Sequence, residues 1–468
     1  MGRIYLSYDP EQRLLLPPDL REWLPEGHLA LFISDVVDEL DLSGIMGRYE
    51  RGDGRGRPPY HPVMMVKLVV YGYSIGKVSS RKIEKATYED VAFRVLACNQ
   101  HPDHDSIAKF RQEHLKELAG LFVEVLKMCE RAGLVKLGHV AIDGSKMRAN
   151  ASKHKAMSYD RMIEKEKQLE TEVGRLLKEA EEADGAEDER HGKGVRGDEL
   201  PAELARRESR LRKIREAKAS LEAEAKEQAQ AAAAAVEAKL AARKQREEET
   251  GKKSRGRAPQ VVNVEEAKPE AKAQRNFTDP ESRIMKDGAT GSFEQSYNAQ
   301  IAVDSQAQII VAATLTQAAN DKQQLVPVLA EVKTNAGRLP EKVTADSGYF
   351  STAAVTNEAL KSVDLYVTPD SGKKTELVEE LATESSPKEL DKDVKARMRE
   401  KLQTENGRAV YKQRKMIVEP VFGQVKEVRG FRRFSFRGLR KNEAEWSLIC
   451  LTHNLLKLFR GKSCLLPA

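Results

Sequence analysis

A long segment in the middle of the chain constrains the fold more than any other feature. From about Met157 to Gly251 the sequence is rich in Ala, Glu, Lys and Arg and is almost free of aromatic residues. Its apolar residues follow the seven-residue spacing of a seam between two helices. The seam positions are Met162, Leu169, Val173 and Leu176 in the first half and Leu204, Leu211, Ile214, Leu221 and Ala225 in the second. The glycine-rich stretch "DGAEDERHGKGVRGDELP" separates the halves, so we expect a coiled-coil-like antiparallel helical hairpin.

Segments typical of strands lie on both sides of this hairpin. Before it comes "LGHVAIDGSKMRANAS", and after it come "SYNAQIAVDS" and "QIIVAATLTQ", which read as a β-hairpin. The stretches "NDKQQLVPVLAEVKTN" and "TAAVTNEALKS" then read as helices, each followed by a short strand, "KVTADSGY" and "VDLYVTP". This order predicts an α/β fold with a mixed sheet and flanking helices. We therefore expect one domain formed by residues 137–156 and 275–460, interrupted by a helical insertion and linker at 157–274.

The N-terminal region, residues 1–136, has the three- and four-residue apolar spacing of helices. Asp105 and Ser106 are candidate N-cap residues of a helix whose polar face carries Lys109, Arg111 and Gln112. A short helix, a turn and this basic helix could form a helix-turn-helix that binds DNA. An ordinary helical bundle explains the same pattern.

Composition excludes several classes of protein. The chain has 468 residues with 79 basic and 73 acidic side chains, a net charge of +6, so its total charge says little about partners. Its four cysteines are far apart and lack CxxC spacing, which argues against a disulfide framework or zinc site and fits a reducing cytoplasm. The N-terminus lacks the pattern of a secretion signal, and no apolar run reaches the ~18 residues of a membrane helix. We expect a cytoplasmic protein without membrane contact.

Two carboxylates follow apolar strands. Asp143 comes directly after Val140-Ala141-Ile142, and Asp346 comes directly after Val343-Thr344-Ala345. Burial of a carboxylate beside a sheet costs several kcal/mol unless hydrogen bonds or a cation compensate, and a divalent metal is one such cation. Taken alone, each aspartate could equally be a turn or cap residue.

A third carboxylate, Glu419, lies in "YKQRKMIVEPVFGQVKEVRGFRR", which we expect to be helical. Asp143, Asp346 and Glu419, together with the Tyr, Arg and Lys around the glutamate, resemble the DDE insertion-sequence transposases with the Tyr-Arg-Glu-Lys signature. The signature positions here are Tyr411, Arg414 or Lys415, Glu419 and Lys426, because Lys415 occupies the standard spacing of the arginine. The stretches "GRPPYHPVMMVKLVVYGY" and "SSRKIEK" are similar to the N-terminal domain of the InsH-like branch of the family.

The resemblance implies an RNase H-like catalytic domain and metal-dependent phosphoryl transfer on DNA. It implies that Asp143 bridges two Mg²⁺ ions, with Mn²⁺ as a possible substitute, and that Asp346 and Glu419 each hold one. It further implies cleavage at the ends of an insertion sequence, strand transfer into target DNA, and a homodimer on double-stranded terminal inverted repeats in the bacterial nucleoid. Mg²⁺ prefers oxygen ligands, so three carboxylates suffice for such a site.

The C-terminal region carries a concentrated positive charge. Between Tyr411 and Lys441 there are ten basic and two acidic residues, a net charge of +8 that exceeds the charge of the whole chain. Such a run beside an acidic cluster is expected where phosphate bridges the two. The candidate DNA-binding residues are Tyr411, Arg414, Lys415, Lys426, Arg429, Arg432 and Arg433, with Lys109 and Arg111 in the N-terminal region.

Alternatives stay open at this stage. A structure-specific nuclease with the same fold, or a domesticated DNA-binding protein without activity, fits much of the pattern. The helical hairpin could be a solvated spacer, which we favour for its Ala-rich C-terminal part, or an arm for dimerisation or DNA binding. Four polar residues near the expected sheet edges could lie at the site, although turn chemistry explains them equally well: Asn298, Asp304, Asn320 and Asp321.

Overall fold

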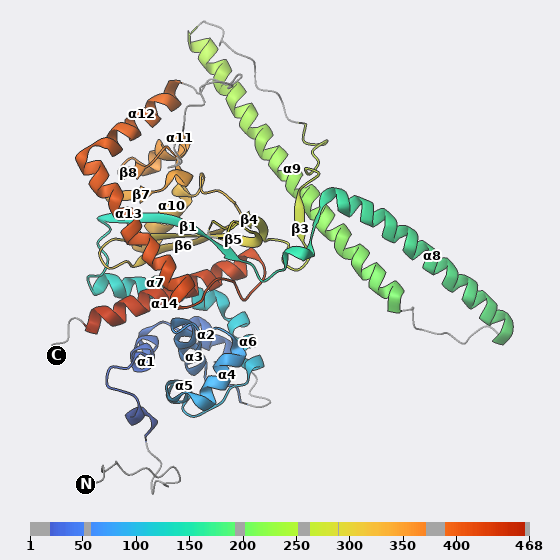
Figure 1. The fold of residues 1–468 in the computed structure, drawn as a ribbon, viewed down its shortest axis with the longest axis horizontal. Coiled ribbons are helices and arrows are strands. Elements are labelled where there is room, and N and C mark those ends of the chain that lie inside the picture. The colour runs from blue at the N-terminus through green and yellow to red at the C-terminus, as the bar shows by residue number, and fades with distance from the viewer. Residues whose placement is uncertain are drawn as a thin grey trace, which may run out of the picture.

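The computed structural model describes residues 19–50, 58–191, 202–250, 263–288, 290–370 and 389–463. A mixed sheet lies between helices, a helical region precedes it in the sequence, and a long helical arm projects from one side (Figure 1). This arrangement confirms the predicted α/β RNase H-like class with a helical N-terminal region.

The sheet is built around β1. Its strands are β1 (His139–Arg148), β4 (Arg283–Lys286), β5 (Phe293–Asp304), β6 (Ile310–Thr316), β7 (Lys342–Ala345) and β8 (Asp364–Val367). β1 pairs antiparallel with β5 on one side and parallel with β7 on the other, and β7 continues parallel to β8. β6 and β4 pair with successive parts of β5. The predicted β-hairpin and the two later strands are therefore confirmed, whereas β4 was not foreseen because four residues are too few for a periodicity signal.

Two helices form the arm, α8 (Tyr159–His191) and α9 (Ala202–Thr250), and they lie between β1 and β5 in the sequence. The predicted seam is confirmed at its root, where a separate apolar cluster includes Met162, Leu169, Leu211, Ile214 and Leu221. Val173, Leu176 and Ala225 are half-buried, and the side chain of Leu204 lies outside the described residues. One expectation needs correction, because the first part of the predicted break, "DGAEDERH", continues α8.

A small two-stranded sheet closes the root of the arm. β2 (Ala156–Ser158) pairs antiparallel with β3 (Gln274–Asn276), which lies at the end of the predicted linker. Residues 251–262 of that linker lie outside the described residues. The pairing brings the two ends of the insertion side by side, as expected of an insertion into one domain.

The N-terminal helices pack around α3 (Pro62–Ser74), nearly all of whose residues are buried. The other elements are η1 (Leu20–Trp23), α1 (Leu29–Glu39), α2 (Ser43–Glu50), α4 (Ser80–Glu89), α5 (Val91–Leu96), α6 (His104–Glu113) and α7 (Leu115–Arg131). α6 begins earlier than predicted: its N-cap is Asp103, whose carboxylate accepts hydrogen bonds from the amide and the hydroxyl of Ser106. A helix starts wherever a side chain satisfies its free amide groups, and Asp103 does so here in place of Asp105.

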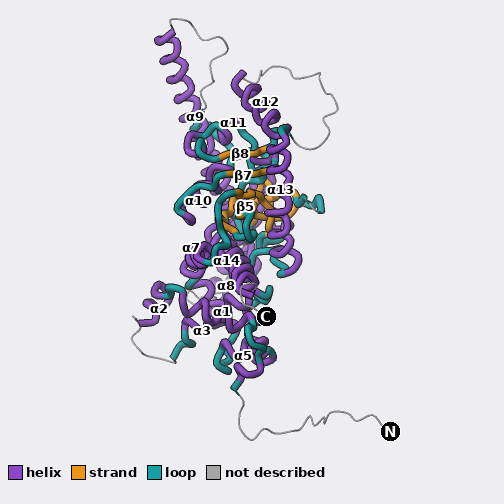
Figure 2. The backbone as a smooth tube through the Cα atoms, turned by 90° about the vertical axis from the view of Figure 1, so that its left-hand side faces the viewer, coloured by secondary structure: helices purple, strands orange, loops and turns teal. Residues whose placement is uncertain are grey.

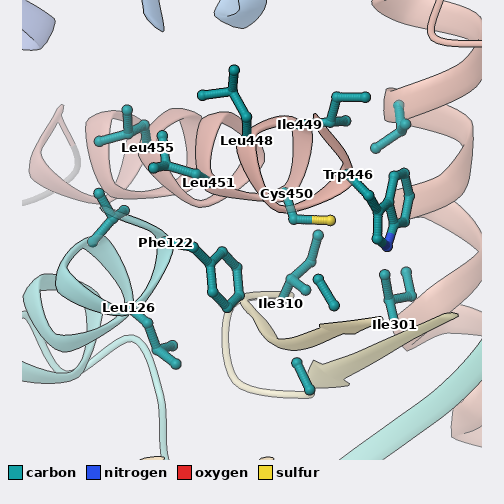
Figure 3. Close-up of a cluster of buried hydrophobic side chains, with 14 of the residues drawn as sticks. Phe122, Leu126, Ile301, Ile310, Trp446, Leu448, Ile449, Cys450, Leu451 and Leu455 are labelled. Atoms are coloured by element: carbon teal, nitrogen blue, oxygen red, sulfur yellow. The ribbon is translucent and has the colours of Figure 1, made fainter. Parts of the chain in front are cut away.

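Helices cover both faces of the sheet, and Figure 2 shows the strands between α10 (Leu325–Ala336) and α13 (Glu405–Gly423). The last helix, α14 (Leu439–Ser463), packs against α7 and the sheet. Figure 3 shows its apolar side chains meeting Phe122 and Leu126 of α7 and Ile301 and Ile310 of the sheet. The remaining elements are η2 (Lys153–Lys155), η3 (Ser347–Tyr349), α11 (Thr352–Val355), η4 (Glu358–Leu360), α12 (Glu389–Gln403) and a π-turn at Gln424–Val428.

Candidate active site

Asp143 and Asp346 lie on neighbouring parallel strands at the same end of the β1–β7 pair. The pairing of β1 with β7 ends at Ala141 opposite Thr344, so both aspartates come just beyond it. Asp346 follows β7 and caps η3, its carboxylate accepting a 2.9 Å hydrogen bond from the Gly348 amide. Asp143 is not at a strand end as predicted, because β1 continues to Arg148 by pairing with β5. The carboxyl ends of parallel strands still bring the two side chains together.

The Asp143 carboxylate is in a position that is costly for a negative charge. Burial raises its pKa to about 6; nearby Arg414 opposes this shift, while Asp346 and Asp321 add to it. Its hydrogen bond from the Gly144 amide, 2.8 Å long, compensates only in part. Like charges held close together favour a cation between them, since each ionised carboxylate raises the cost of ionising the next.

Helix α13 brings a basic side chain to Asp143. Arg414 is buried, and its Nη1 lies 3.3 Å from Oδ2 of Asp143. Tyr411, one turn earlier, is half-buried beside Arg414, and burial raises the pKa of its hydroxyl. Lys415 points to solvent. Of the two candidates for the basic signature position, it is therefore Arg414 that contacts the aspartate.

Glu419 lies on a different side of α13. Its side chain is exposed, whereas Arg414, five positions earlier, faces Asp143. Five residues correspond to about 140° around a helix at 3.6 residues per turn, so the two side chains point in different directions. Across the part of the chain that the structure describes, no three Asp, Glu, His or Cys side chains are close enough to hold one metal ion. Shared ligation by Asp143, Asp346 and Glu419 therefore stays a prediction.

A fourth carboxylate, Asp321, lies beside the two aspartates. Its Oδ1 accepts hydrogen bonds from Nδ2 of Asn298 at 2.6 Å and Nε2 of Gln300 at 2.7 Å. A Cβ atom added at Gly348 would be 3.0 Å from Oδ1 of Asp346 and 3.5 Å from Oδ2 of Asp321, so the two carboxylates flank this glycine. Asn298 and Asp321 thus lie at the site, as was considered from the sequence.

Sequence reasoning missed three further residues. Lys146 lies 3.9 Å from Oδ1 of Asp321, and burial lowers the pKa of its ammonium group. Tyr349 is fully buried and donates a hydrogen bond to Gln300 Oε1. The β1–β5 register places Lys146 opposite Asn298 and Gly144 opposite Gln300. This register brings the β1 and β5 residues of the site together, and no local pattern in the sequence predicts it.

Two regions of the chain match models of known protein families. Residues 18–113 match a model described as a transposase domain (DUF772), and residues 239–455 match a model described as a transposase DDE domain. The chain belongs to the DDE insertion-sequence transposases. The second match includes Asp346 and Glu419, while Asp143 precedes it on the other side of the arm. No curated protein and no solved structure matches this transposase.

The acidic cluster of this transposase fits a hard divalent cation. Its donors are carboxylate oxygens, which Mg²⁺ prefers, and burial is the main cause of the raised pKa of Asp143, to which the charges of Asp346 and Asp321 add. Of the three predicted ligands, Asp143 and Asp346 are the two that lie together in the structure.

The predicted DNA-binding residues separate into buried and exposed groups. Arg429 is 7% exposed, donates to Thr452 Oγ1 at 2.7 Å and lies over the Phe431 ring, while Arg111 is 6% exposed and lies over Tyr73 and Phe436. Their burial corrects the expectation that they face DNA, because a guanidinium inside the core cannot reach a phosphate. Their aromatic neighbours explain the preference for Arg. Lys109, Lys415, Arg432 and Arg433 are exposed, and Arg432 forms an ion pair with Glu427.

Two other predicted residues have structural contacts. Lys426 is half-buried, and its ammonium group donates to Ser145 Oγ at 2.5 Å and to the Lys146 carbonyl at 2.8 Å, which fixes the π-helix that follows α13 against β1. Asp304 accepts a 2.6 Å hydrogen bond from the Leu137 amide at the opposite end of β1 from the carboxylates. Asn320 is exposed. Within the described ranges, no helix of the transposase is long and apolar enough to cross a membrane.

Proposed function

We propose that this transposase cuts DNA at the ends of an insertion sequence and joins the freed 3′ ends to target DNA. The observation that carries the proposal is the meeting of Asp143 and Asp346 on neighbouring strands, with Asp143 half-buried and its pKa raised to about 6. Structural aspartates are normally compensated by hydrogen bonds, whereas burial keeps the pKa of Asp143 raised despite the Gly144 amide and Arg414.

Asp143 and Asp346 would hold Mg²⁺, or Mn²⁺ in its place, with Glu419 as the third proposed ligand from α13. When bound, such ions supply an activated nucleophile and neutralise the charge that develops on the attacking and leaving oxygens. The chain itself orients the carboxylates: Gly144 and Gly348 amides each donate to one of them. Arg414 balances part of the charge on Asp143, which limits the repulsion between the two aspartates.

The remaining residues of the site have separate roles in the proposal. Tyr411 positions Arg414. Lys426 positions the middle of β1 by its hydrogen bond to Ser145. The exposed Lys415 and Arg433 are proposed to contact phosphates, which gives affinity without sequence specificity. Lys109 on α6 is the proposed contact of the N-terminal region with DNA.

The test uses duplex DNA that carries the terminal inverted repeats flanking the coding sequence, incubated with the protein and Mg²⁺. Joined products would support the transposase. Cuts without joining would indicate a structure-specific nuclease, and a mobility shift with intact DNA would indicate a domesticated binding protein.

Asp143→Asn and Asp346→Asn separate catalysis from binding in this assay. Each is expected to lower the cleavage rate by at least about 10³-fold, or about 4 kcal/mol, because one ligand for the cation is lost. Binding of the same DNA should persist. Asp393→Asn, a change to an exposed aspartate on α12, is the matched control and should cut normally. Cleavage by Asp143→Asn at the normal rate would contradict the proposal.

Glu419→Gln tests the third ligand by itself. If Glu419 joins the metal site when DNA and Mg²⁺ bind, this variant loses cleavage as strongly as the two aspartate variants. Normal cleavage would remove Glu419 from the site and leave the aspartates in place.

Transposition requires that two element ends be held together, so we also propose a homodimer on DNA in the bacterial nucleoid. Light scattering of the complex with one-end and paired-end DNA would measure the number of protein chains. A single chain in a complex that completes strand transfer would contradict the dimer.

A further inference from the structure

Cationic side chains gather where the arm joins the sheet, and we name this region the arm-root surface. It lines two adjoining hollows of about 540 and 520 Å³. His154 and Lys155 of η2 and Thr278 line both of them. Figure 1 shows the place, near β3 where α8 and α9 cross. Its cations are exposed and come from three segments: Lys153 and Lys155, then Arg206, Arg210 and Lys213, then Arg433 and Arg437.

The contribution of α9 is a single face of the helix. Arg206, Arg210 and Lys213 are spaced by four and three residues, so their side chains point the same way. None of the three forms an ion pair with another residue in the described ranges. The neighbouring face differs, because Arg215 and Lys218 both pair with Glu166 of α8. The charges of one face thus bind the two helices together, and those of the other face remain available to an external anion.

The η2 segment and the segment of Arg433 and Arg437 are held in place by hydrogen bonds to backbone carbonyls. The Phe277 amide donates to the Lys155 carbonyl at 3.0 Å, Nδ2 of Asn276 donates to the Ser152 carbonyl at 2.8 Å, and Nε of Arg437 donates to the Asn150 carbonyl at 3.2 Å. The cations of these two segments are therefore presented by a fixed backbone. Among the residues that line the two hollows, the one carboxylate is Glu294, which pairs with Lys153 at 3.6 Å.

Strand β1 connects the arm-root surface with the candidate active site. The Phe434 amide donates to the Arg148 carbonyl at 2.9 Å, so the segment that carries Arg433 lies beside the end of β1. Asp143 is on the same strand, five residues earlier. A strand rises about 3.3 Å per residue, which gives a separation of about 16 Å. Duplex DNA rises about 3.4 Å per base pair, so this separation corresponds to about 5 bp.

We propose that the arm-root surface binds the phosphate backbone of double-stranded DNA about 5 bp from the scissile bond. The inference rests on the proposed function, because it takes the scissile phosphate to lie at Asp143. A dense set of cations, of which only Lys153 has an ion-pair partner among the described residues, suits closely spaced phosphates better than the scattered charges of an acidic protein. The arm then acts as a DNA-binding element as well as a spacer.

The test measures how salt affects binding of a fluorescein-labelled duplex of about 30 bp, or three helical turns, by fluorescence anisotropy. The variant Arg206→Gln, Arg210→Gln, Lys213→Gln removes the α9 cations. Each lost phosphate contact reduces the slope of log K against log salt by about 0.9, so the slope should fall by about 2.7. Its exposed positions predict an unchanged melting temperature, which checks that the variant folds.

The matched control removes three cations from other exposed parts of the arm, Arg161→Gln, Arg212→Gln and Lys226→Gln. Its slope should change by less than about 1, because these residues lie outside the hollows. Equal losses in both triple variants would overturn the inference in favour of a general charge effect. Polyglutamate that displaces the duplex at equal charge concentration would overturn it in favour of an acidic protein partner.

Cleavage separates the inference from the proposed function. At saturating protein, the α9 triple variant should still cut terminal-repeat DNA in Mg²⁺, since the carboxylates are untouched. A wild-type slope in this variant, with cleavage intact, would overturn the inference and leave the function standing. Failure of the wild-type protein to bind any duplex would overturn both. Hydroxyl-radical footprints should lose protection at about 5 bp or more from the cut in the variant alone.

Discussion

The sheet with its covering helices and the helical arm use charged side chains in opposite ways. Around the sheet, several charged groups are buried; Glu445, for example, is 1% exposed, accepts from Tyr73 at 2.9 Å and accepts from the Ser435 amide at 2.7 Å. In the arm, charged groups stay at the surface and pair across the two helices, as Arg215 does with Glu166 at 3.1 Å. Buried charges fix the positions of their partners and shift pKa values. Ion pairs at the surface are weaker, because water competes for the charged groups.

The two regions also differ in how much apolar contact holds them. The sheet and α14 share one continuous core, while the arm has a narrow seam near its root. The arm is tied to the sheet through Glu224, which contacts Arg275 at 2.5 Å and Arg283 of β4 at 2.6 Å. Burial alone would raise the pKa of Glu224, but the two arginines lower it overall. The arm is therefore a separate packing unit with an electrostatic anchor.

The largest expected effect on stability is in the core. Trp446 is fully buried, donates from Nε1 to the Gln300 carbonyl at 3.2 Å and stacks on Phe422. Trp446→Ala should lower the free energy of unfolding by about 3–5 kcal/mol, measured by urea denaturation. Trp23→Ala, at a tryptophan that is 49% exposed, is the control. Equal losses in the two variants would mean that the core does not depend on α14.

Asp321→Asn should lower the rate of DNA cleavage without affecting DNA binding. The change removes the negative charge that Asn298, Gln300 and Lys146 contact. Loss of such supporting contacts typically lowers activity by about 10–100-fold. We expect that loss in the cleavage rate, with unchanged affinity for duplex DNA. Asn320→Ala, at an exposed neighbour, should cut normally. A full-rate Asp321→Asn would show that this carboxylate is only structural.

The core should be sensitive to acid at His453. Burial lowers its pKa from 6.5 to about 3, while Nε2 donates to the Gln308 carbonyl at 2.9 Å. Below pH 6.5 the unfolded chain takes up a proton that the folded chain refuses, so stability falls as the pH decreases. Between pH 6.5 and about 5 the loss is about 2 kcal/mol.

His453→Gln keeps a donor for the Gln308 carbonyl and removes the titrating group. Its stability should depend less on pH than that of the wild type across this interval, as measured by chemical denaturation at each pH. His61→Gln, at an exposed histidine, should retain the wild-type dependence. Identical profiles for all three proteins would mean that His453 is not responsible.

A change in the arm seam should stay local. Leu221→Ala should lower the free energy of local opening in α8 and α9 by about 2 kcal/mol, because its side chain is 6% exposed in the seam. Hydrogen exchange would report faster exchange in the arm and no change in the sheet strands. Leu177→Ala, at a position 40% exposed on α8, is the control. Faster exchange in β1 would show that the two regions unfold together.

The smallest effect on the stability of the sheet is expected from complete removal of the arm. Ser158 pairs with Gln274, so residues 159–273 can be replaced by Asn-Gly, which favours a tight β-hairpin turn. The shortened protein should keep its sheet and melt cooperatively, with a loss limited to the Glu224 anchor. Near-ultraviolet circular dichroism would check the packing around Trp446. An unfolded product would contradict the interpretation of the arm as an insertion.

Much of the fold was predictable because its signals are local. The seven-residue spacing predicted α8 and α9, and β-branched runs predicted β5 and β6. Asp143 and Asp346 were predicted as site residues because a carboxylate after an apolar strand is costly without compensation, and the structure places both at one site. Short elements such as β2, β3 and β4 carry too few residues for such a signal.

The failures concern side chains whose direction depends on distant packing. Arg111 and Arg429 belong to basic runs that suggested a DNA-facing surface, yet both are buried among aromatic rings. A sequence gives the charge of a residue but not which side of its helix the core will cover. The same limit applies to Glu419, which is exposed on α13 while Arg414 faces Asp143.

The sequence by itself determined the family, the α/β class, the inserted hairpin and the two aspartates that follow apolar strand residues. These features depend on residues that are neighbours in the sequence. Tertiary structure alone decided that Lys146, Gln300 and Tyr349 join these aspartates and that seven cations from three segments meet at the arm root. Strand register and the closure of the arm by β2 and β3 create these groupings. Both depend on contacts between residues far apart in the chain, which local patterns do not encode.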